Sequence, residues 1–435
     1  MLGRRKLTRR QFVAGMGMAA GLAMLGGCGG GARVGDGPRT VEEASGTVTL
    51  TGFSSSPAEE ERLREMLADF EEANPEIQVD YQVTTGDYMQ RLVTQLSSNT
   101  AADVFYLDSL FAPQLIATGA LRPLDDYIEG SEVIDPADFY RPLVDAFTSL
   151  EDGMIYGMPK DYSILGLFYS LELFEQAGLD PDSPPATWDE VWEYGRKLTD
   201  GDGRWGLSLQ PELPRYLAFA LQQDAPIIDD ERNVMPNLEG NLRALEFFAG
   251  MYTGPEKIAV QPADTGAQWA GDALGKGGIG MVFEGNWAIP FLNDTYPDRE
   301  YRIAPLPYEG GQDSLLFTVA YCMNANAENP DAAWKLIEYL TGREGQRRWG
   351  ELGLAIPPRE DAVQSYLDQH PQARALVDST PEATAWQLNT SDPQPVLDNS
   401  NNSIQRAFSS GPEQFRSILE EWKSTVESDV ERADG

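Results

Sequence analysis

Gly285, Asn286 and Trp287 bring a glycine, an amide and a large aromatic ring together at one point of the chain. They follow an apolar run, Ile279 to Phe283, whose length between turn signals predicts a buried strand. Glycine lets the backbone come close to a neighbouring molecule. An indole face suits the C–H face of a sugar ring, while amide and carboxylate oxygens accept hydrogen bonds from its hydroxyls. Trp287 is therefore either a platform at the mouth of a cleft or a core tryptophan after an ordinary turn.

The residues before Trp287 extend this pattern into Gly275-Lys276, four residues, Met281, and then Gly285-x-Trp287. The pattern resembles the central motif of the extracellular solute-binding proteins of ABC importers, of the maltose/oligosaccharide type. The similarity continues in VTLTGFSSS, ADVFYLDSLFAPQLIATGALRPLD, IYGMPKDYSILGLFYSLELFEQAGL, PPATWDEVWEYGRKL and NPDAAWKLIEYLTGREGQRRWGELGLAIPPR. One departure is that glycines stand at 277, 278 and 280, where relatives usually carry alanines. We expect a looser turn before this strand.

The resemblance implies an α/β fold of the periplasmic-binding-protein type (Venus flytrap), with two lobes joined by hinge strands. Its crossings would lie near Pro159 and Tyr321. The expected lobes are residues 47–159 with 323–375, and residues 160–322 with 376–435. The expected function is that of a substrate-binding subunit, which captures a di- or oligosaccharide between the lobes and delivers it to a membrane permease.

The same resemblance implies ligand-binding residues on both sides of the cleft. Those after the predicted strands and crossings are Ser55, Asp108, Asp161, Tyr162, Tyr321, Gly285, Asn286 and Trp287. Arg359 is a candidate cation and Trp386 a candidate second aromatic platform. For Ser55 the alternative is turn chemistry beside a helix cap, and for Asp108 the alternative is a cap of the next helix.

Strands that alternate with helices are expected to position Ser55 and Asp108. Val48 to Phe53 and Ile77 to Val83 predict strands, and a capping box at Ser56-x-x-Glu59 predicts the start of a helix between them. A second helix and a third strand, Asp103 to Leu107, complete the pattern of a parallel sheet with right-handed crossovers. Ligands of such sheets bind beyond the carboxyl ends of the strands, which is where Ser55 and Asp108 fall.

The first 27 residues have the features of an export signal. Five basic residues precede a mostly apolar run that is too short to span a membrane. Thr8-Arg9-Arg10-Gln11-Phe12 fits the twin-arginine signature, and Leu25-Gly-Gly-Cys28 fits a bacterial lipobox. We therefore expect cleavage before Cys28, lipid attachment to its thiol, and anchoring at the outer face of the cell membrane. Residues 28–46 are expected to form a flexible tether.

The charge and composition of the chain argue against several classes of binding partner. The net charge is −36, and loss of the five basic residues of the signal takes it to about −41. Such a surface repels nucleic acid and anionic lipid. The length favours two domains, and we expect a monomer. With Cys28 lipidated, Cys322 has no disulfide partner and is expected to be a small buried hydrophobe.

Enzymatic chemistry finds little support. His370 is the single histidine, which argues against serine and thiol triads and against metal sites that need several histidines or cysteines. We expect no catalytic residue, no cofactor and no metal. A secreted glycoside hydrolase remains an alternative because it would also use tryptophans and paired carboxylates. Among binding proteins, a receptor of the same fold stays open, and the solute could instead be a polyol or a glycerophosphodiester.

Overall fold

The structure is a computed structural model that describes residues 38–434, except 42, 55, 85 and 202. Its strands join into one mixed sheet, in the order β2-β1-β3-β9-β4-β7-β5-β6, with β10 beside β9 and β8 beside β4. The expected signal peptide, Cys28 and Ser55 lie outside the described residues. Among the described helices, none is both long and apolar enough to cross a membrane.

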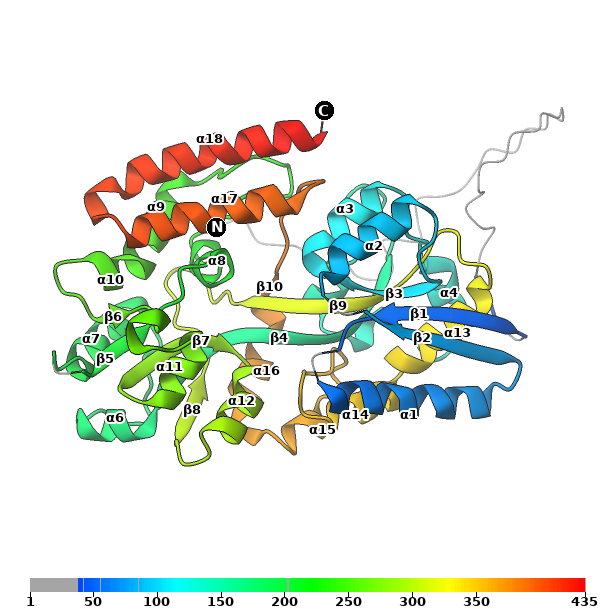
Figure 1. Cartoon of the computed structure of the whole chain (residues 1–435), viewed down its shortest axis with the longest axis horizontal. Coiled ribbons are helices and arrows are strands. Elements are labelled where there is room, and N and C mark those ends of the chain that lie inside the picture. The colour runs from blue at the N-terminus through cyan, green and yellow to red at the C-terminus, as the bar shows by residue number, and fades with distance from the viewer. Residues whose placement is uncertain (1–37, 42, 55, 85, 202, 435) are drawn as a thin grey trace, which may run out of the picture. The chain divides into compact units, whose positions relative to one another are not determined.

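The first part of the sheet follows the sequence pattern closely. β1 (Gly46–Gly52) pairs in parallel with β2 (Ile77–Val83) on one side and with β3 (Val104–Asp108) on the other. Because the chain steps in opposite directions from β1 to β2 and from β2 to β3, right-handed crossovers put α1 (Pro57–Ala73) and α2 (Tyr88–Ser97) on opposite faces. Figure 1 shows this arrangement around the blue strands.

Two long antiparallel strands form the middle of the sheet, β4 (Gly157–Ser170) and β9 (Leu315–Met323). The first half of β4 pairs with β9, and its second half pairs with β7 (Ile279–Gly285) and β8 (Tyr301–Ala304). β9 also pairs with β3, so these two strands connect the two parts of the sheet (Figure 1). A short apolar run marks the second half of β4 in the sequence, from Ile164, whereas its first half shows no such run. Pro159 and a register shift between Pro159 and Asp161 break the alternation that would have marked its first half.

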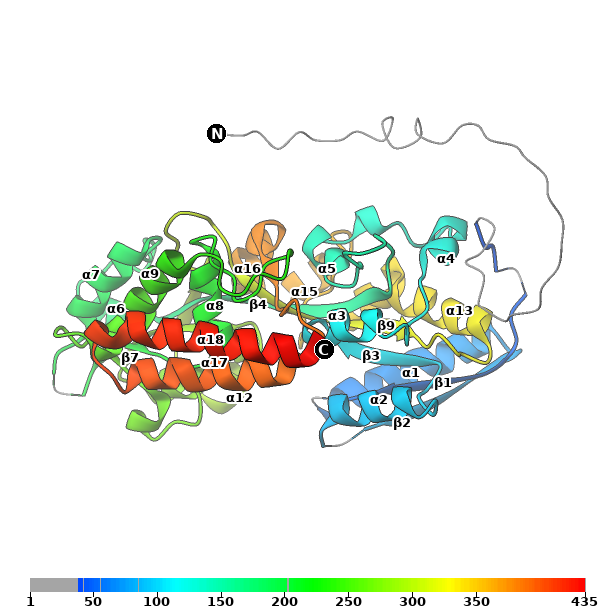
Figure 2. The same cartoon turned by 90° about the horizontal axis from the view of Figure 1, so that it is seen from above.

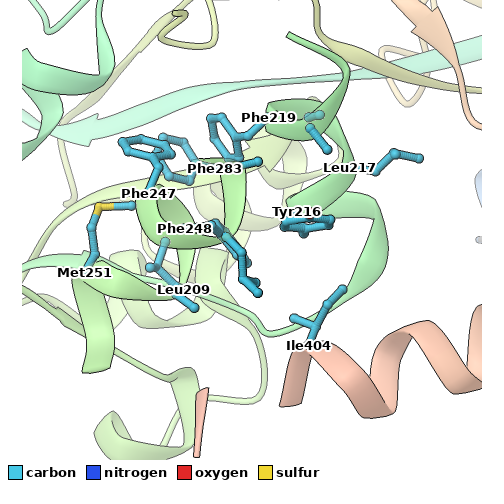
Figure 3. Close-up of a cluster of buried hydrophobic side chains, with 14 of the residues drawn as sticks. Leu209, Tyr216, Leu217, Phe219, Phe247, Phe248, Met251, Phe283 and Ile404 are labelled. Carbon is cyan, nitrogen blue, oxygen red and sulfur yellow. The ribbon is translucent and has the colours of Figure 1, made fainter. Parts of the chain in front are cut away.

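The second part of the sheet packs against helices that come from distant segments. β5 (Trp205–Ser208) pairs in parallel with β7 and with β6 (Ala259–Val260). Aromatic side chains from α8 (Leu213–Leu221) and α9 (Leu238–Phe248) pack around Phe283 of β7, as Figure 3 shows. Ile404 reaches the same core from α17, so the C-terminal segment helps to close it (Figure 3).

The C-terminal helices α17 (Pro393–Phe408) and α18 (Phe415–Asp434) lie side by side in both views (Figures 1 and 2). Trp422 of α18 is almost fully buried. The other α-helices and the last strand are α3 (Ala112–Ala117), α4 (Asp125–Gly130), α5 (Arg141–Asp145), α6 (Leu171–Gln176), α7 (Trp188–Leu198), α10 (Gly250–Thr253), α11 (Ala270–Lys276), α12 (Ala288–Thr295), α13 (Pro330–Thr341), α14 (Arg343–Gly350), α15 (Gln364–Leu367), α16 (Arg374–Ser379) and β10 (Thr384–Ala385).

The buried apolar side chains form three clusters. One belongs to β1–β3 and their helices and includes Cys322, which is fully buried as expected. A second surrounds β5, β7, α8 and α9, and a third joins β7 and α12 to α15 and α16. The third cluster combines Tyr140 and Ile356, from the segments expected in the first lobe, with Val282 and Ile289, from the second. The lobe boundaries drawn from the sequence therefore stay a prediction.

Candidate functional site

Trp287 stands at the junction of β7 and α12, and its ring is held from several sides. The indole Nε1 donates a hydrogen bond to Glu284 Oε2 over 2.9 Å. Phe317 of β9 meets the ring edge to face at a centroid separation of 5.4 Å, and the guanidinium carbon of Arg215 lies 5.4 Å from the ring centroid. The ring covers Gly285, where a Cβ atom would lie 2.2 Å from an indole carbon. The side chain is partly exposed, so Trp287 is neither a full core residue nor a mobile surface group.

Glu284 and Arg215 form a polar network beneath this ring. Glu284 is fully buried, and Arg215 Nη2 lies 2.9 Å from its Oε2. Arg215 also pairs with Glu212 at 3.1 Å, and Gln210 donates to the same Glu212 side chain. Burial raises the pKa of Glu284, and the charge of Arg215 offsets part of that rise. The ion pair is thus the arrangement that lets a carboxylate stay in this apolar setting.

Parallel pairing explains why these residues meet. β5 and β7 run in the same direction, with Ser208 opposite Val282. Gln210 and Glu212 follow the carboxyl end of β5, and Glu284 lies at the carboxyl end of β7. The network therefore occupies the edge of the sheet where α/β proteins place their ligands.

Five side chains form a partly exposed strip across the middle strands, which we call the central strip. The register sets Asp161 of β4 and Asp108 of β3 opposite Val319 of β9, and Ser163 opposite Phe317. Residues opposite one another share a face of the sheet, so all five point to the same side. Each is partly exposed. Because Phe317 touches Trp287, the central strip runs up to the Glu284 network without a break.

Lys160 lies at the other end of the central strip, where the β4 register shifts. Its ammonium pairs with Asp161 and with Glu59 of α1, the latter at 3.4 Å. The same nitrogen lies 4.0 Å from the centroid of a Trp349 ring and 5.0 Å from that of Tyr106. Lys160 is 3% exposed, so this cation is enclosed by two carboxylates and two aromatic rings.

Asp108 has a different environment from the other carboxylates of the site. Its Oδ1 accepts a hydrogen bond from the Leu110 N–H at 2.9 Å, which caps the short turn after β3. Although the residue keeps some exposed surface, burial of its carboxyl raises the pKa of Asp108 to about 6. Within the part of the chain that the structure describes, Asp108 makes no ion pair. It is both the predicted cap and a member of the central strip.

The structure brings together some of the residues proposed from sequence. Trp287, Asp108 and Asp161 lie on or beside the central strip, and Gly285 lies directly under the Trp287 ring. Asn286 is buried, and its Oδ1 accepts a hydrogen bond from the Ile164 N–H at 3.1 Å, so it fixes the β4–β7 junction.

The other described candidates are closed off from solvent. Tyr162 is 1% exposed and its hydroxyl bonds to Thr380. Tyr321 packs edge to face against Tyr106, and Trp386 packs near Phe317 at 6% exposure. Arg359 is buried between the carboxylates of Asp138 and Asp361. These four side chains are buried here and contribute to packing, and their contact with a ligand stays a prediction.

Several residues of the site were not proposed from sequence, namely Glu59, Lys160, Arg215, Glu284, Phe317 and Trp349. A weak signal existed for Glu284, a lone acidic residue that directly follows a buried run, and for Arg215, a lone cation in an apolar helix. A cavity of about 750 Å³ beside β8 and α16 contains none of the predicted residues. It does not belong to this site.

Comparison with known proteins gives one family and a consistent set of folds. A family profile described as "Bacterial extracellular solute-binding protein" matches residues 65–377. A putative binding protein of Brucella abortus (strain 2308) is 24% identical over 352 residues, which cover 78% of this chain and 83% of the relative.

Two solved structures illustrate the range of this fold. The sugar-binding protein MalE of Xanthomonas citri superposes with a TM-score of 0.77 at 24% identity, covering 89% of this chain and 98% of that one. UgpB of Mycobacterium tuberculosis in complex with glycerophosphocholine superposes with a TM-score of 0.71 at 20% identity, covering 89% and 100%. Both superpositions establish a two-lobed α/β architecture for the present chain, as the sequence predicted.

Proposed function

Because the chain belongs to the family of bacterial extracellular solute-binding proteins, we propose that it is the substrate-binding subunit of an ABC importer and that its solute is a di- or oligosaccharide. The observation that carries the proposal is Trp287, a partly exposed indole fixed by Glu284 and continuous with the carboxylates of the central strip. The similarity to a sugar-binding protein supports it.

This arrangement matches the surface of a sugar. One face of a pyranose is apolar and stacks on an indole, and its hydroxyl groups donate to carboxylates such as Asp108 and Asp161. Fixing the indole in advance lowers the entropy that binding must otherwise spend on ordering it. A ligand on the central strip would touch residues from both parts of the sheet, so we propose that it favours closure of the two lobes about β4 and β9.

The proposal includes export and anchoring. The twin-arginine segment would direct the protein across the cell membrane, and acylation of Cys28 would hold it at the outer face of that membrane beside the permease subunits. Replacing Cys28 with serine should release the protein into the medium or the periplasm. Retention of that variant in the membrane fraction would contradict the lipid anchor.

We propose further that the protein acts as a monomer and binds its solute without altering it. Thermal shift against a panel of di- and oligosaccharides tests the sugar, since a ligand at a hundred times its dissociation constant stabilises by about 2.7 kcal/mol. Mass spectrometry after incubation with the best ligand should recover it unchanged. A hydrolysed product would instead favour a glycoside hydrolase.

The second candidate solute is a glycerophosphodiester or a polyol. It is favoured by the similarity to UgpB, whose structure contains glycerophosphocholine. A sugar and a polyol are uncharged, whereas a glycerophosphodiester carries an ionised phosphate.

A further inference from the structure

The candidate site contains two cations, and each is already neutralised by carboxylates. Lys160 pairs with Glu59 and Asp161 and lies against two aromatic rings. Arg215 pairs with Glu212 and Glu284, and its side chain is 13% exposed. An incoming phosphate would therefore meet cations whose charge is already balanced, and it would compete with their carboxylates for them.

The carboxylates of the site outnumber these cations. Asp108 adds a fifth carboxylate, and it makes no ion pair with any residue that the structure describes. It lies across β9 from Asp161 on the same face of the sheet, so the middle of the central strip has an excess of negative charge. Bringing a second negative charge into such a place is unfavourable.

The unpaired hydrogen-bonding atoms of the Glu284 network also disfavour a phosphate. Three buried atoms of the Glu284 network have no hydrogen-bond partner among the described residues, namely Glu284 Oε1, Gln210 Oε1 and Arg215 Nε. Two of them accept hydrogen bonds and one donates. A hydroxyl group can both donate and accept, whereas an ionised phosphate oxygen only accepts. All three atoms are hidden from solvent here, so a solute would reach them only where the network opens. Hydroxyl hydrogens could then serve both acceptors, whereas an ionised phosphate has no hydrogen to offer them.

We propose that this site selects an uncharged, polyhydroxylated solute and rejects the phosphorylated form of the same solute. The inference rests on the proposed function, because it assumes that the central strip and Trp287 form the binding site. It goes beyond that function by assigning charge selection to Lys160, Arg215 and Asp108.

The test compares neutral and phosphorylated solutes on the full mature protein. Thermal shift would screen maltose, trehalose, sucrose and mannobiose beside trehalose 6-phosphate, sucrose 6-phosphate, glycerol 3-phosphate and glycerophosphocholine. Calorimetry on the best neutral sugar and its phosphate should give a difference of about a hundredfold or more, the equivalent of 2.8 kcal/mol. The measurement is repeated in 1 M NaCl, where a Debye length of about 3 Å screens the general negative charge of the protein. If the site itself discriminates against the phosphate, the difference in affinity should persist in 1 M NaCl.

The possible results separate failure of the charge selection from failure of the proposed function. A phosphorylated sugar that binds as tightly as its neutral counterpart overturns the inference and leaves the proposed function standing. Discrimination that disappears in 1 M NaCl overturns it as well, because the general charge would then account for it. Binding of the phosphate-bearing solutes alone overturns both, and so does a screen in which no solute of either class stabilises the protein.

A variant localises the effect within the site. Asp108→Asn removes the unpaired carboxylate at constant size and should reduce the discrimination by about tenfold, the equivalent of 1.4 kcal/mol. Asp298→Asn makes the same charge change at an exposed turn and should leave it unaltered. Equal effects of the two variants would contradict the role of Asp108.

Discussion

At the scale of single residues, the site depends on a carboxylate that is itself hidden from solvent. Glu284 Oε2 accepts from the Trp287 indole and also faces Arg215, so one oxygen orients both groups. The ring is partly exposed and stands at the N-cap position of α12, where the chain leaves β7. Trp287 is thus the residue expected to contact a ligand, whereas Glu284 holds Trp287 and Arg215 in place.

For Trp287→Ala we expect weak binding with modest loss of stability. An aromatic hot spot typically contributes about 2 kcal/mol to binding, which corresponds to roughly thirtyfold in affinity. Trp422→Ala is the matched control, because Trp422 is 1% exposed and should cost about 3–5 kcal/mol of unfolding free energy without changing affinity. Calorimetry and denaturant unfolding of both variants separate the two outcomes. Parental affinity in folded Trp287→Ala would remove this residue from the site.

Glu284→Ala should destabilise the protein strongly. The substitution leaves the indole N–H without its acceptor and Arg215 with a single carboxylate, so we expect a loss near 3 kcal/mol, at the low end for breaking a buried ion pair. Glu212→Ala removes the other, more exposed partner of Arg215 and should cost less than about 1 kcal/mol. Equal losses in urea unfolding would contradict the assigned role of Glu284.

Asp108 should make stability fall with increasing pH in a mildly acidic range. Its pKa is raised from 3.8 in the unfolded chain to about 6, so the folded state holds the proton more tightly. The stabilising contribution is complete below about pH 4 and is lost as pH rises through about 6. Unfolding free energies of the parent and of Asp108→Asn, measured from pH 4 to 7, should therefore diverge in favour of the variant. Parallel pH profiles would show that Asp108 titrates normally.

Among the elements, β4 and β9 have both a binding role and a connecting role. They hold the central strip, and they connect the part of the sheet around β1 with the part around β7. β4 also passes close to α16 at Gly166, where a Cβ atom would lie 2.3 Å from Leu376 and 2.9 Å from the Ala304 carbonyl oxygen. The β4 backbone can approach its neighbours this closely because position 166 has no side chain.

Gly166→Ala should therefore destabilise the protein by about 1–3 kcal/mol, the usual cost of overpacking. The backbone oxygen of β8 cannot move aside as a side chain could. Gly250→Ala is the control, since its nearest contact would be 3.9 Å away and alanine suits a helix better than glycine. That variant should be neutral or slightly more stable in thermal unfolding. A neutral Gly166→Ala would mean that α16 can shift away from β4.

At the scale of the whole molecule, the proposed function needs a change in the balance between open and closed forms. A ligand shifts that balance only by its differential affinity for the two forms. The central strip meets this condition if the Glu284 network and the Lys160 group approach the solute from opposite sides. β4 and β9 would then bend while the clusters on either side stay intact.

Small-angle scattering should show a smaller radius of gyration when the best sugar is present at saturation. Trp287→Ala measured at the same sugar concentration should keep the radius of the free protein, because it binds weakly. An unchanged curve for the parent at confirmed saturation would argue against hinge closure and would leave binding itself untouched.

The sequence alone determined the local structure and the family of folds. Helix starts at Ser56 and Thr187 follow from side chains that accept hydrogen bonds within three residues, so their signals are local. The order of strands and helices up to Asp108 predicted the parallel pairing of β1, β2 and β3. Trp287 and Asp108 could be proposed because strand ends are visible in the apolar pattern. The lobe boundaries, the lipid anchor and the ligand contacts remain predictions.

Which polar residues meet, and which are buried, depends on the packing of segments that are far apart in the chain. Arg215 and Glu284 are separated by 69 residues and Lys160 and Glu59 by 101, and no periodicity links such pairs. Tyr162 and Asp161 are neighbours in sequence, yet they lie on opposite faces of β4, because alternate residues of a strand point to opposite sides. Choosing between them required the register with β9 and the helices packed behind it. A residue's type sets what it can bind, whereas the packing of distant segments sets whether it is exposed to do so.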